Sequence, residues 1–244
     1  MSSLLAEPER HELRPAAFAA TLGRTVVVAP HADDESLACG GLLALLARAG
    51  VEAAVVVVTD GAASHPGSRA FPPERLRAQR EAEAREAVRV LGHGGRVYLL
   101  GLPDGAVPAP ASDAFAEAAG RLAALLAEIG PETVVAPWRR DPHPDHEAAW
   151  HLAWSVRDPS ARWIEAPVWA WHRGGDRAAP QDHEATAWRL DVSSVLDVKA
   201  AAVAAHASQT TGLIADSPAG FVLTPDLLAP FRRPYELYLD PTDA

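Results

Sequence analysis

The 244-residue chain contains a single cysteine, Cys39, and a single lysine, Lys199. One cysteine excludes a disulfide within the chain, and a reducing cytoplasm is therefore the expected location. No uninterrupted apolar run of about 18 residues is present to span a bilayer. The first residues, MSSLLAEPERHELRP, lack the cationic start and the long apolar run of a secretion signal. We therefore expect a soluble cytoplasmic protein without a membrane partner.

Positive charge is also scarce. The chain has 22 Lys and Arg against 32 Asp and Glu, which gives a formal net charge of -10. Sequence-independent binding to nucleic acid needs a cationic face that displaces counterions, so we expect no nucleic-acid partner. Abundant Ala and Arg suggest a bacterial source. With 48% hydrophobic residues, no internal repeat and no clear linker, one domain over residues 1–244 is the simplest organisation.

Short β-branched runs alternate with longer helical patterns, which is typical of βα units around a parallel sheet. The predicted strands are 25–29, 54–59, 96–100, 133–136, 163–171 and 186–192. The predicted helices are 36–48, 74–91, 112–129, one from about 145, and 195–208. We expect a core of about 24–210, a Pro-rich segment 211–244 that wraps the surface, and a loop 61–73 that is either a lid or an ordinary surface loop.

The first predicted strand is followed by Pro30-His31-Ala32-Asp33-Asp34-Glu35. In an open parallel sheet, ligands bind at the carboxyl ends of strands, so these side chains face the expected crevice. His31 and Asp34 are three residues apart across a tight turn, and their imidazole and carboxylate suit Zn²⁺. Asp33 lies where a general base for a metal-bound water is needed. Taken alone, the acidic run is equally typical of a helix N-cap.

The fourth predicted strand leads into Asp141-Pro142-His143-Pro144-Asp145-His146-Glu147. The spacing of His143 and His146 presents both rings toward one side of a helix start, although it also fits an exposed helix entry capped by Asp145. Both polar segments lie at predicted carboxyl ends of parallel strands, so both can reach the same crevice. Together they supply His, Asp and His with one open position, the composition of a catalytic zinc site.

These segments resemble the two signature motifs of the LmbE-like, or PIG-L, family of N-acetylglucosaminyl deacetylases. The similarity extends in order over residues 24–210. Its further elements are Arg80-x-x-Glu83-x-x-x-Ala87-x-x-x-Leu91-Gly92, Leu100-Gly101-Leu102-Pro103-Asp104-Gly105 and His206-Ala207-Ser208-Gln209. The chain departs from the family pattern at Ala32, where proline is common, and after residue 212. The second departure leaves the substrate open.

The resemblance implies a single Rossmann-like α/β domain, with a mostly parallel sheet flanked by helices. It also implies a bound Zn²⁺, with Fe²⁺ as an alternative metal in vivo. The residues that match the family's metal ligands are His31, Asp34 and His146. Asp33 matches the general base.

The remaining family roles concern the transition state and the substrate. His143, as a cation, would stabilise the oxyanion, and Asp145 would be its orienting partner. Arg80 and Asp104 match groups that contact the sugar. Each of these roles is an expectation from the resemblance.

We therefore predict a metal-dependent hydrolase that removes an N-acetyl or other N-acyl group from an amino sugar, a glycoconjugate or a related small molecule. A homo-oligomer is left open. The same site would suit an amidase acting on a thiol conjugate or an antibiotic intermediate. A two-His, one-carboxylate site also describes non-haem Fe(II) oxygenases, and a binding protein with an idle site is a third alternative. The α/β pattern and the adjacent Asp33 favour hydrolysis.

Overall fold

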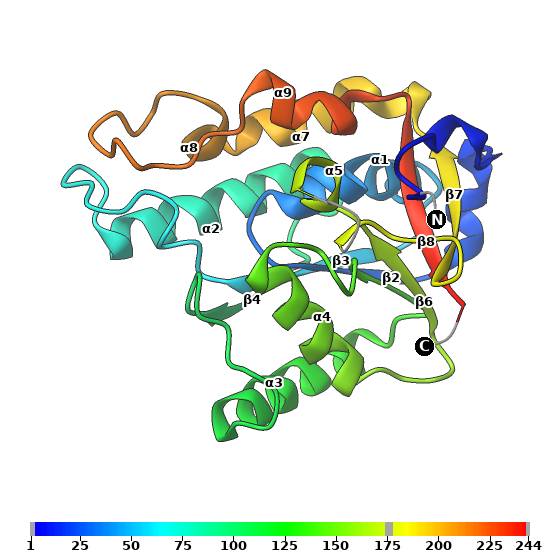
Figure 1. Ribbon diagram of the computed structural model, residues 1–244, viewed down its shortest axis with the longest axis horizontal. Coiled ribbons are helices and arrows are strands. Elements are labelled where there is room, and N and C mark those ends of the chain that lie inside the picture. The colour runs from blue at the N-terminus through cyan, green and yellow to red at the C-terminus, as the bar shows by residue number, and fades with distance from the viewer. Residues whose placement is uncertain (1–2, 174–177, 243–244) are drawn as a thin grey trace.

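The computed structural model describes residues 3–173 and 178–242, which form an α/β domain around a mixed sheet (Figure 1). The strands of this sheet are β1 (Glu12–Arg14), β2 (Thr25–Ala29), β3 (Ala53–Thr59), β4 (Val97–Leu102), β5 (Thr133–Pro137), β6 (Arg162–Ala166), β7 (Ala185–Asp191) and β8 (Tyr235–Pro241). Their order across the sheet is β1-β7-β8-β6-β5-β2-β3-β4. All pairings are parallel except those of β8, which runs antiparallel to β6 and β7.

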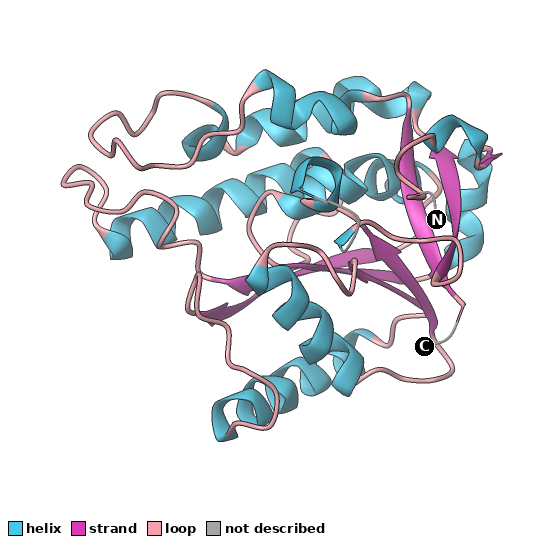
Figure 2. Ribbon diagram, in the orientation of Figure 1, coloured by secondary structure: helices cyan, strands magenta, loops and turns pink. Residues whose placement is uncertain are grey.

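Helices cover both faces of the sheet (Figure 2). The α-helices are α1 (Asp34–Arg48), α2 (Pro73–Val90), α3 (Asp113–Ile129), α4 (Pro144–Ser155), α5 (Ala170–Arg173), α7 (Leu196–Ala205), α8 (Ala207–Thr210) and α9 (Pro225–Leu228). Four 3-10 turns complete them: η1 (Pro8–Arg10), η2 (Ala16–Leu22), η3 (Ser193–Val195) and η4 (Ala229–Arg232). Within the described part of the chain, no helix has the length and apolar character needed to cross a membrane.

The central strands are buried on both faces, as their continuous Val-rich sequences require. Every residue of β2 and β3 is buried. Alternate side chains of these strands enter two cores, one beneath α1, α2 and α7 and the other against α3 and α4. Local residues determine both ends of α3. Ser112 Oγ caps its start by accepting a hydrogen bond from Phe115 N at 3.1 Å, and Gly130 ends it in the left-handed conformation.

The order of the strands creates a switch point at β2. Along the chain, β2 pairs with β3 on one side, and the later strand β5 returns to its other side, with Val27 opposite Val135. Ligands bind in open α/β sheets at the carboxyl ends of strands beside such a point. The segments after β2 and β5, which carry the two polar motifs, therefore begin side by side at this edge.

Three sequence predictions need correction. The segment 211–244 does not only wrap the surface, because its residues 235–241 form β8 in the interior of the sheet. The strand predicted at 163–171 ends at Ala166, and the chain then turns into α5. The helix predicted at 195–208 is interrupted at His206, whose ψ of 59° is not helical, so that α7 and α8 are separate.

Candidate metal centre and active site

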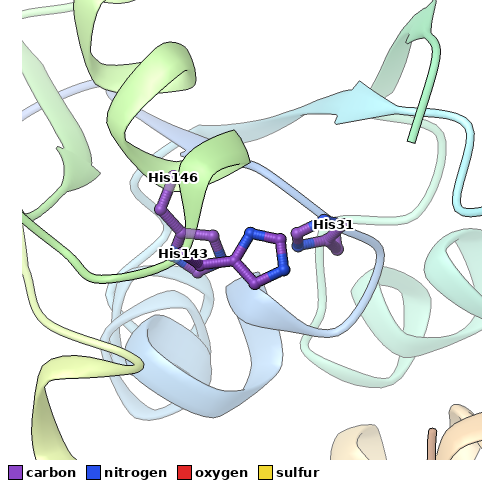
Figure 3. Close-up of side chains that lie close together, drawn as sticks. All are labelled: His31, His143 and His146. Atoms are coloured by element: carbon purple, nitrogen blue, oxygen red, sulfur yellow. The ribbon is translucent and has the colours of Figure 1, made fainter. Parts of the chain in front are cut away.

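Three histidines from two distant segments meet above the carboxyl ends of β2 and β5. His31 follows β2 after Pro30, His143 is the N-cap of α4, and His146 lies in the first turn of α4. Figure 3 shows the three side chains close together. The ring centroids are 4.7 Å apart for His31 and His143, 5.3 Å for His31 and His146, and 5.1 Å for His143 and His146. The two predicted motifs therefore form one site.

Asp34 joins the histidines of the two motifs. Its Oδ2 lies 3.3 Å from His31 Nδ1 and 3.2 Å from His146 Nε2, and it accepts a hydrogen bond from the His31 backbone N–H at 2.9 Å. Burial would raise the pKa of Asp34, but the neighbouring charges of His146 and His31 hold that pKa well below its usual range. The three residues predicted to bind the metal are thus in mutual contact.

Other groups of donors share the same space. One nitrogen from each of His31, His143 and His146 lies within 4.8 Å of the other two, and a second such group consists of His31, Asp104 and Asp145. The structure therefore brings His143 as close to the centre as the predicted ligands. His31 is common to both groups, which places its ring at the middle of the site.

The donors fit a divalent cation. Four carboxylates lie within 3.4 Å of the imidazoles of His31 and His146, namely those of Asp34, Asp104, Asp141 and Asp145. Concentrated negative charge away from water needs a compensating cation. His146 is fully buried, and among the described residues neither of its ring nitrogens makes a hydrogen bond. An unsatisfied buried imidazole nitrogen beside carboxylate oxygens is the chemistry of a zinc ligand.

Asp141 supports the fully buried His146 from outside the cluster. Its Oδ1 lies 3.4 Å from His146 Nδ1, and its Oδ2 accepts from the backbone N–H groups of Val168, Trp169 and Ala170 at 3.0, 2.9 and 3.2 Å. A carboxylate beside the second nitrogen of a metal-ligating histidine fixes the ring and raises its basicity. The sequence motif contains Asp141, but nothing in its spacing indicated this contact.

Asp33, the predicted general base, has a strained backbone. Its φ of 146° is outside the regions that L-residues readily adopt. Arg80 Nη2 lies 3.3 Å from Asp33 Oδ2 and also donates to the carbonyl oxygen of Ala32. Burial raises the pKa of Asp33 to about 6. The charge of Arg80 lowers this pKa, and the charge of Asp34 raises it by a smaller amount. A buried carboxylate with this pKa is suited to accept and return a proton.

Glu35 and His206 form a buried pair behind Asp33. Glu35 Oε2 accepts from the Asp33 backbone N–H at 3.0 Å, while Glu35 Oε1 lies 2.9 Å from His206 Nε2 and accepts from Ser36 Oγ at 2.6 Å. Neither residue was predicted to belong to the site. The only sequence information that pointed to His206 was the similarity of residues 206–209 to the family pattern. That similarity does not indicate which residues His206 contacts.

The contacts of Asp145 differ from the prediction. Its carboxylate lies 3.1 Å from His31 Nε2 and accepts from the backbone N–H of Gly105 at 2.8 Å. Only its backbone N–H reaches His143, donating to Nδ1 at 3.2 Å, because His143 is the N-cap of the helix. Asp145 therefore orients His143 through the main chain, and its carboxylate supports His31.

The surroundings of His143 bear on its predicted cationic state. Burial, followed by the neighbouring charges of His31 and His146, lowers the pKa of His143 to about 4. Since Nδ1 accepts a hydrogen bond from the main chain, the proton of the neutral ring is on Nε2. The surroundings of His143 therefore favour a neutral ring that donates from Nε2.

The two predicted sugar contacts have different positions. Asp104 lines the cavity described below, lies 3.4 Å from His31 Nε2 and accepts from Ala63 N at 2.9 Å. Burial would raise the pKa of Asp104, but the hydrogen bond and charge of His31 lower it to about 2. Arg80 is 3% exposed and does not line the cavity. Its guanidinium instead holds the Asp33 segment.

A cavity of about 340 Å³ opens onto the cluster. Its polar end is formed by His31, Asp33, Asp34, Asp104 and His143. Residues 63, 64 and 66 of the loop 61–73 also line it, and this loop is tethered to the segment 216–221. A small molecule entering the cavity would meet the Asp33 carboxylate, the His143 ring and the cluster of His and Asp donors together.

Comparisons with known proteins identify a family and related enzymes. The PIG-L family, described as GlcNAc-PI de-N-acetylase, matches residues 26–156. The chain is 31% identical to a 1D-myo-inositol 2-acetamido-2-deoxy-alpha-D-glucopyranoside deacetylase of Mycobacteroides abscessus, over 78% of this chain and 83% of the relative. The enzyme of the same description from Rhodococcus erythropolis is 28% identical, over 86% of this chain and 88% of the relative.

The solved structures support the fold. A deacetylase triple mutant from the teicoplanin biosynthetic pathway has a TM-score of 0.66 at 24% identity, covering 91% of this chain and all of that one. The fold is also found in a 4-carboxy-2-hydroxymuconate hydratase from Pseudomonas putida, with a TM-score of 0.56 at 23% identity over 77% and 80% of the two chains. The fold therefore serves more than one reaction, and the family match identifies the enzyme class: the chain belongs to the PIG-L family of de-N-acetylases, which are hydrolases of amides.

Proposed function

We propose that this enzyme is a zinc-dependent N-deacetylase that hydrolyses the acetamide of an amino-sugar glycoconjugate. The observation that carries the proposal is the meeting of His31, Asp34 and His146 beside Asp33 at the polar end of one cavity. The relatives named as deacetylases of an N-acetylglucosamine derivative support the substrate class. His31, Asp34 and His146 would hold the ion, with His143 adjacent as an N–H donor.

When bound, a zinc ion at these donors supplies Lewis acidity to the amide carbonyl and to water. The protein supplies the proton transfers. Asp33 Oδ accepts a proton from the water whose oxygen attacks the carbonyl carbon, and it returns that proton to the nitrogen as the C–N bond breaks. His143 Nε2–H donates to the developing oxyanion, a kind of interaction whose removal typically costs about 3–4 kcal/mol of barrier.

Arg80 holds the segment that carries the base. Its guanidinium bonds to the Ala32 carbonyl and lies against the Asp33 carboxylate. This contact fixes the direction of the Asp33 side chain toward the cavity. We propose this positioning role for Arg80, and a contact with a sugar hydroxyl for Asp104, which lines the cavity.

The proposal is tested with the methyl glycoside of N-acetylglucosamine and protein prepared without metal, then loaded with Zn²⁺. We expect equal amounts of acetate and free amine, produced only by the loaded protein and without a need for O₂. An Asp33→Asn variant should keep its zinc and release neither product above the buffer rate. Oxygen-dependent turnover would instead favour the iron oxygenase alternative, and an active Asp33→Asn enzyme would contradict the assignment of the base.

A further inference from the structure

One side of the cavity is apolar and takes no part in the proposed hydrolysis. It is formed by six side chains that have no hydrogen-bonding groups. We name this set the apolar wall: Leu37, Val168, Phe221, Leu223, Leu227 and Phe231. Four of its members belong to one hydrophobic cluster of buried residues, against which Phe221 and Leu227 pack.

The apolar wall continues directly from the catalytic groups. Leu37 lies one helical turn after Asp33 and Asp34 on α1. The ring of Trp169 stacks at 6.0 Å from His143 on one side and lies edge-on at 5.5 Å from Phe221 on the other. A substrate whose amide lies at the metal donors therefore has other parts of itself against the apolar wall.

The polar groups nearest the apolar wall already have partners. His172 Nε2 is hydrogen-bonded to the carbonyl oxygen of Leu227 at 2.9 Å, and the backbone N–H groups of Phe221 and Leu223 donate to Ser64 and Gln209. Substrate hydroxyl groups placed here would lose their hydrogen bonds to water and gain none from the protein. A sugar or inositol ring is poorly matched to such a surface.

Most of the apolar wall comes from a different part of the chain than the proposed catalytic groups. The family match covers residues 26–156 and contains every proposed catalytic and metal-binding residue. Five of the six members of the apolar wall lie beyond it, at Val168 and in residues 221–231. These five residues come from the loop after β6 and from the segment 221–231, which leads into α9 and η4. All of the apolar wall except Leu37 is therefore supplied by the part of the chain outside the family match.

From this arrangement we infer that the natural substrate carries an apolar group, aliphatic or aromatic, of several carbons, in addition to the hydrolysed amide. The inference rests on the proposed function and specifies its substrate class. The single methyl of an acetyl group is too small to fill the space that these six side chains border, whereas a longer apolar group would displace water from that space. Each methylene buried in such a site contributes roughly fourfold to binding.

The apolar group could be attached on either side of the amide. It would be either the acyl chain or the group joined to the sugar, the aglycone. Both present the same chemistry to the apolar wall. Four substrates separate the two sources: the methyl, octyl and inositol glycosides of N-acetylglucosamine, and the methyl glycoside of N-octanoylglucosamine. All are used below their aggregation concentrations, and free amine is measured.

We expect kcat/KM for the octyl glycoside, the N-octanoyl compound, or both, to exceed that for the methyl N-acetyl compound at least tenfold. The inositol glycoside should not exceed the methyl glycoside. Equal rates for all four, or a preference for inositol, would overturn the inference and leave the proposed deacetylase intact. Release of amine from none of them would overturn the proposed function and the inference together.

Two matched substitutions test whether the apolar wall is responsible. Leu227→Asn places an amide on the apolar wall, and Leu213→Asn makes the same change at a 44% exposed position outside the cavity. The ratio of kcat/KM for the preferred apolar substrate to that for the methyl N-acetyl compound should fall at least fivefold in Leu227→Asn and remain at the wild-type value in Leu213→Asn. An unchanged ratio in both would show that the apolar group binds elsewhere.

Discussion

The backbone N–H of Asp33 donates to the carboxylate of Glu35 at 3.0 Å, while Asp33 itself has a φ of 146°. Backbone strain of this kind costs on the order of 1–3 kcal/mol and persists only where the surroundings enforce it. Here Glu35 is in turn held by His206 and Ser36. The direction of the proposed base is therefore set by Glu35 as well as by Arg80, and neither residue lines the cavity.

Replacing Glu35 by Gln should lower kcat while the zinc content remains. The amide presents one acceptor oxygen in place of two, so it cannot hold both the Asp33 N–H and the partners on Oε1. Hydrogen bonds to charged groups contribute about 1.5–3 kcal/mol, which corresponds to a loss of roughly 10- to 150-fold in kcat. KM should change little, since Glu35 does not line the cavity. Equal losses of zinc and activity would show a purely structural role.

Gly61 provides a separate test of Arg80. A Cβ at Gly61 would lie 2.8 Å from Arg80 Cδ, whereas a Cβ at Gly67 in the same loop meets nothing within 4 Å. Both glycines have a positive φ, 65° and 77°, so Ala at either position is strained by about 1–2 kcal/mol. Only Gly61→Ala displaces Arg80, and a misplaced catalytic group can cost about 100-fold.

We therefore expect Gly61→Ala to lose roughly 10- to 100-fold in kcat/KM, and Gly67→Ala to remain within about twofold of the wild type. The comparison is made by measuring kcat/KM for both variants. Their zinc content is measured as well, to check that the metal site is intact. The same loss in both would mean that loop strain, and not the position of Arg80, limits activity.

Metal binding should be visible in thermal stability. A hundredfold excess of zinc over its Kd stabilises the folded state by about 2.7 kcal/mol, which for a chain of this size raises Tm by roughly 5–11 °C. His146→Ala should abolish most of this increase. His151→Ala is the matched control on the same helix, because its ring packs on Trp150 and lies outside the site. A full increase of Tm in His146→Ala would remove His146 from the metal ligands.

The parts of the fold that were predictable depend on local patterns. The sequence predicted β2, β3 and the helix after each motif, because the pattern of neighbouring residues indicates both burial and periodicity. Strand β8 was missed because its partners, β6 and β7, are far away in sequence. The Pro-rich segment before it also suggested an irregular surface tail.

The same distinction holds for the candidate site. The meeting of His31, Asp34 and His146 followed from two motifs at the ends of parallel strands. The direction of a side chain within a motif did not follow, and the Asp145 carboxylate accordingly contacts His31 rather than His143. The pairing of Glu35 with His206 joins residues 171 positions apart. Such contacts depend on tertiary packing, which no local spacing encodes.

The loop beside the cavity is tethered by Asp216. Its carboxylate accepts from Ser68 Oγ at 2.6 Å and from the backbone N–H groups of Arg69 and Ala70 at 2.8 and 3.0 Å. The Ser68 hydrogen bond, followed by those of the main chain, lowers the pKa of Asp216 to about 2. Because the folded-state pKa lies below the unfolded value of about 3.9, this tether is complete above pH 4 and is lost as the pH falls through 2.

Asp216→Asn should therefore loosen the loop at neutral pH, where the wild-type tether is intact. The amide offers one acceptor oxygen, which cannot serve the Ser68 hydroxyl and both backbone N–H groups together. We expect hydrogen-exchange protection of Arg69 and Ala70 to fall roughly tenfold, because at least one hydrogen bond to residue 216 is lost. Asp158→Asn, which disturbs a comparable turn at Ser160 far from the cavity, should leave these two amides unchanged. Unchanged protection in Asp216→Asn would show that the loop is held by its other contacts with residues 217 and 221.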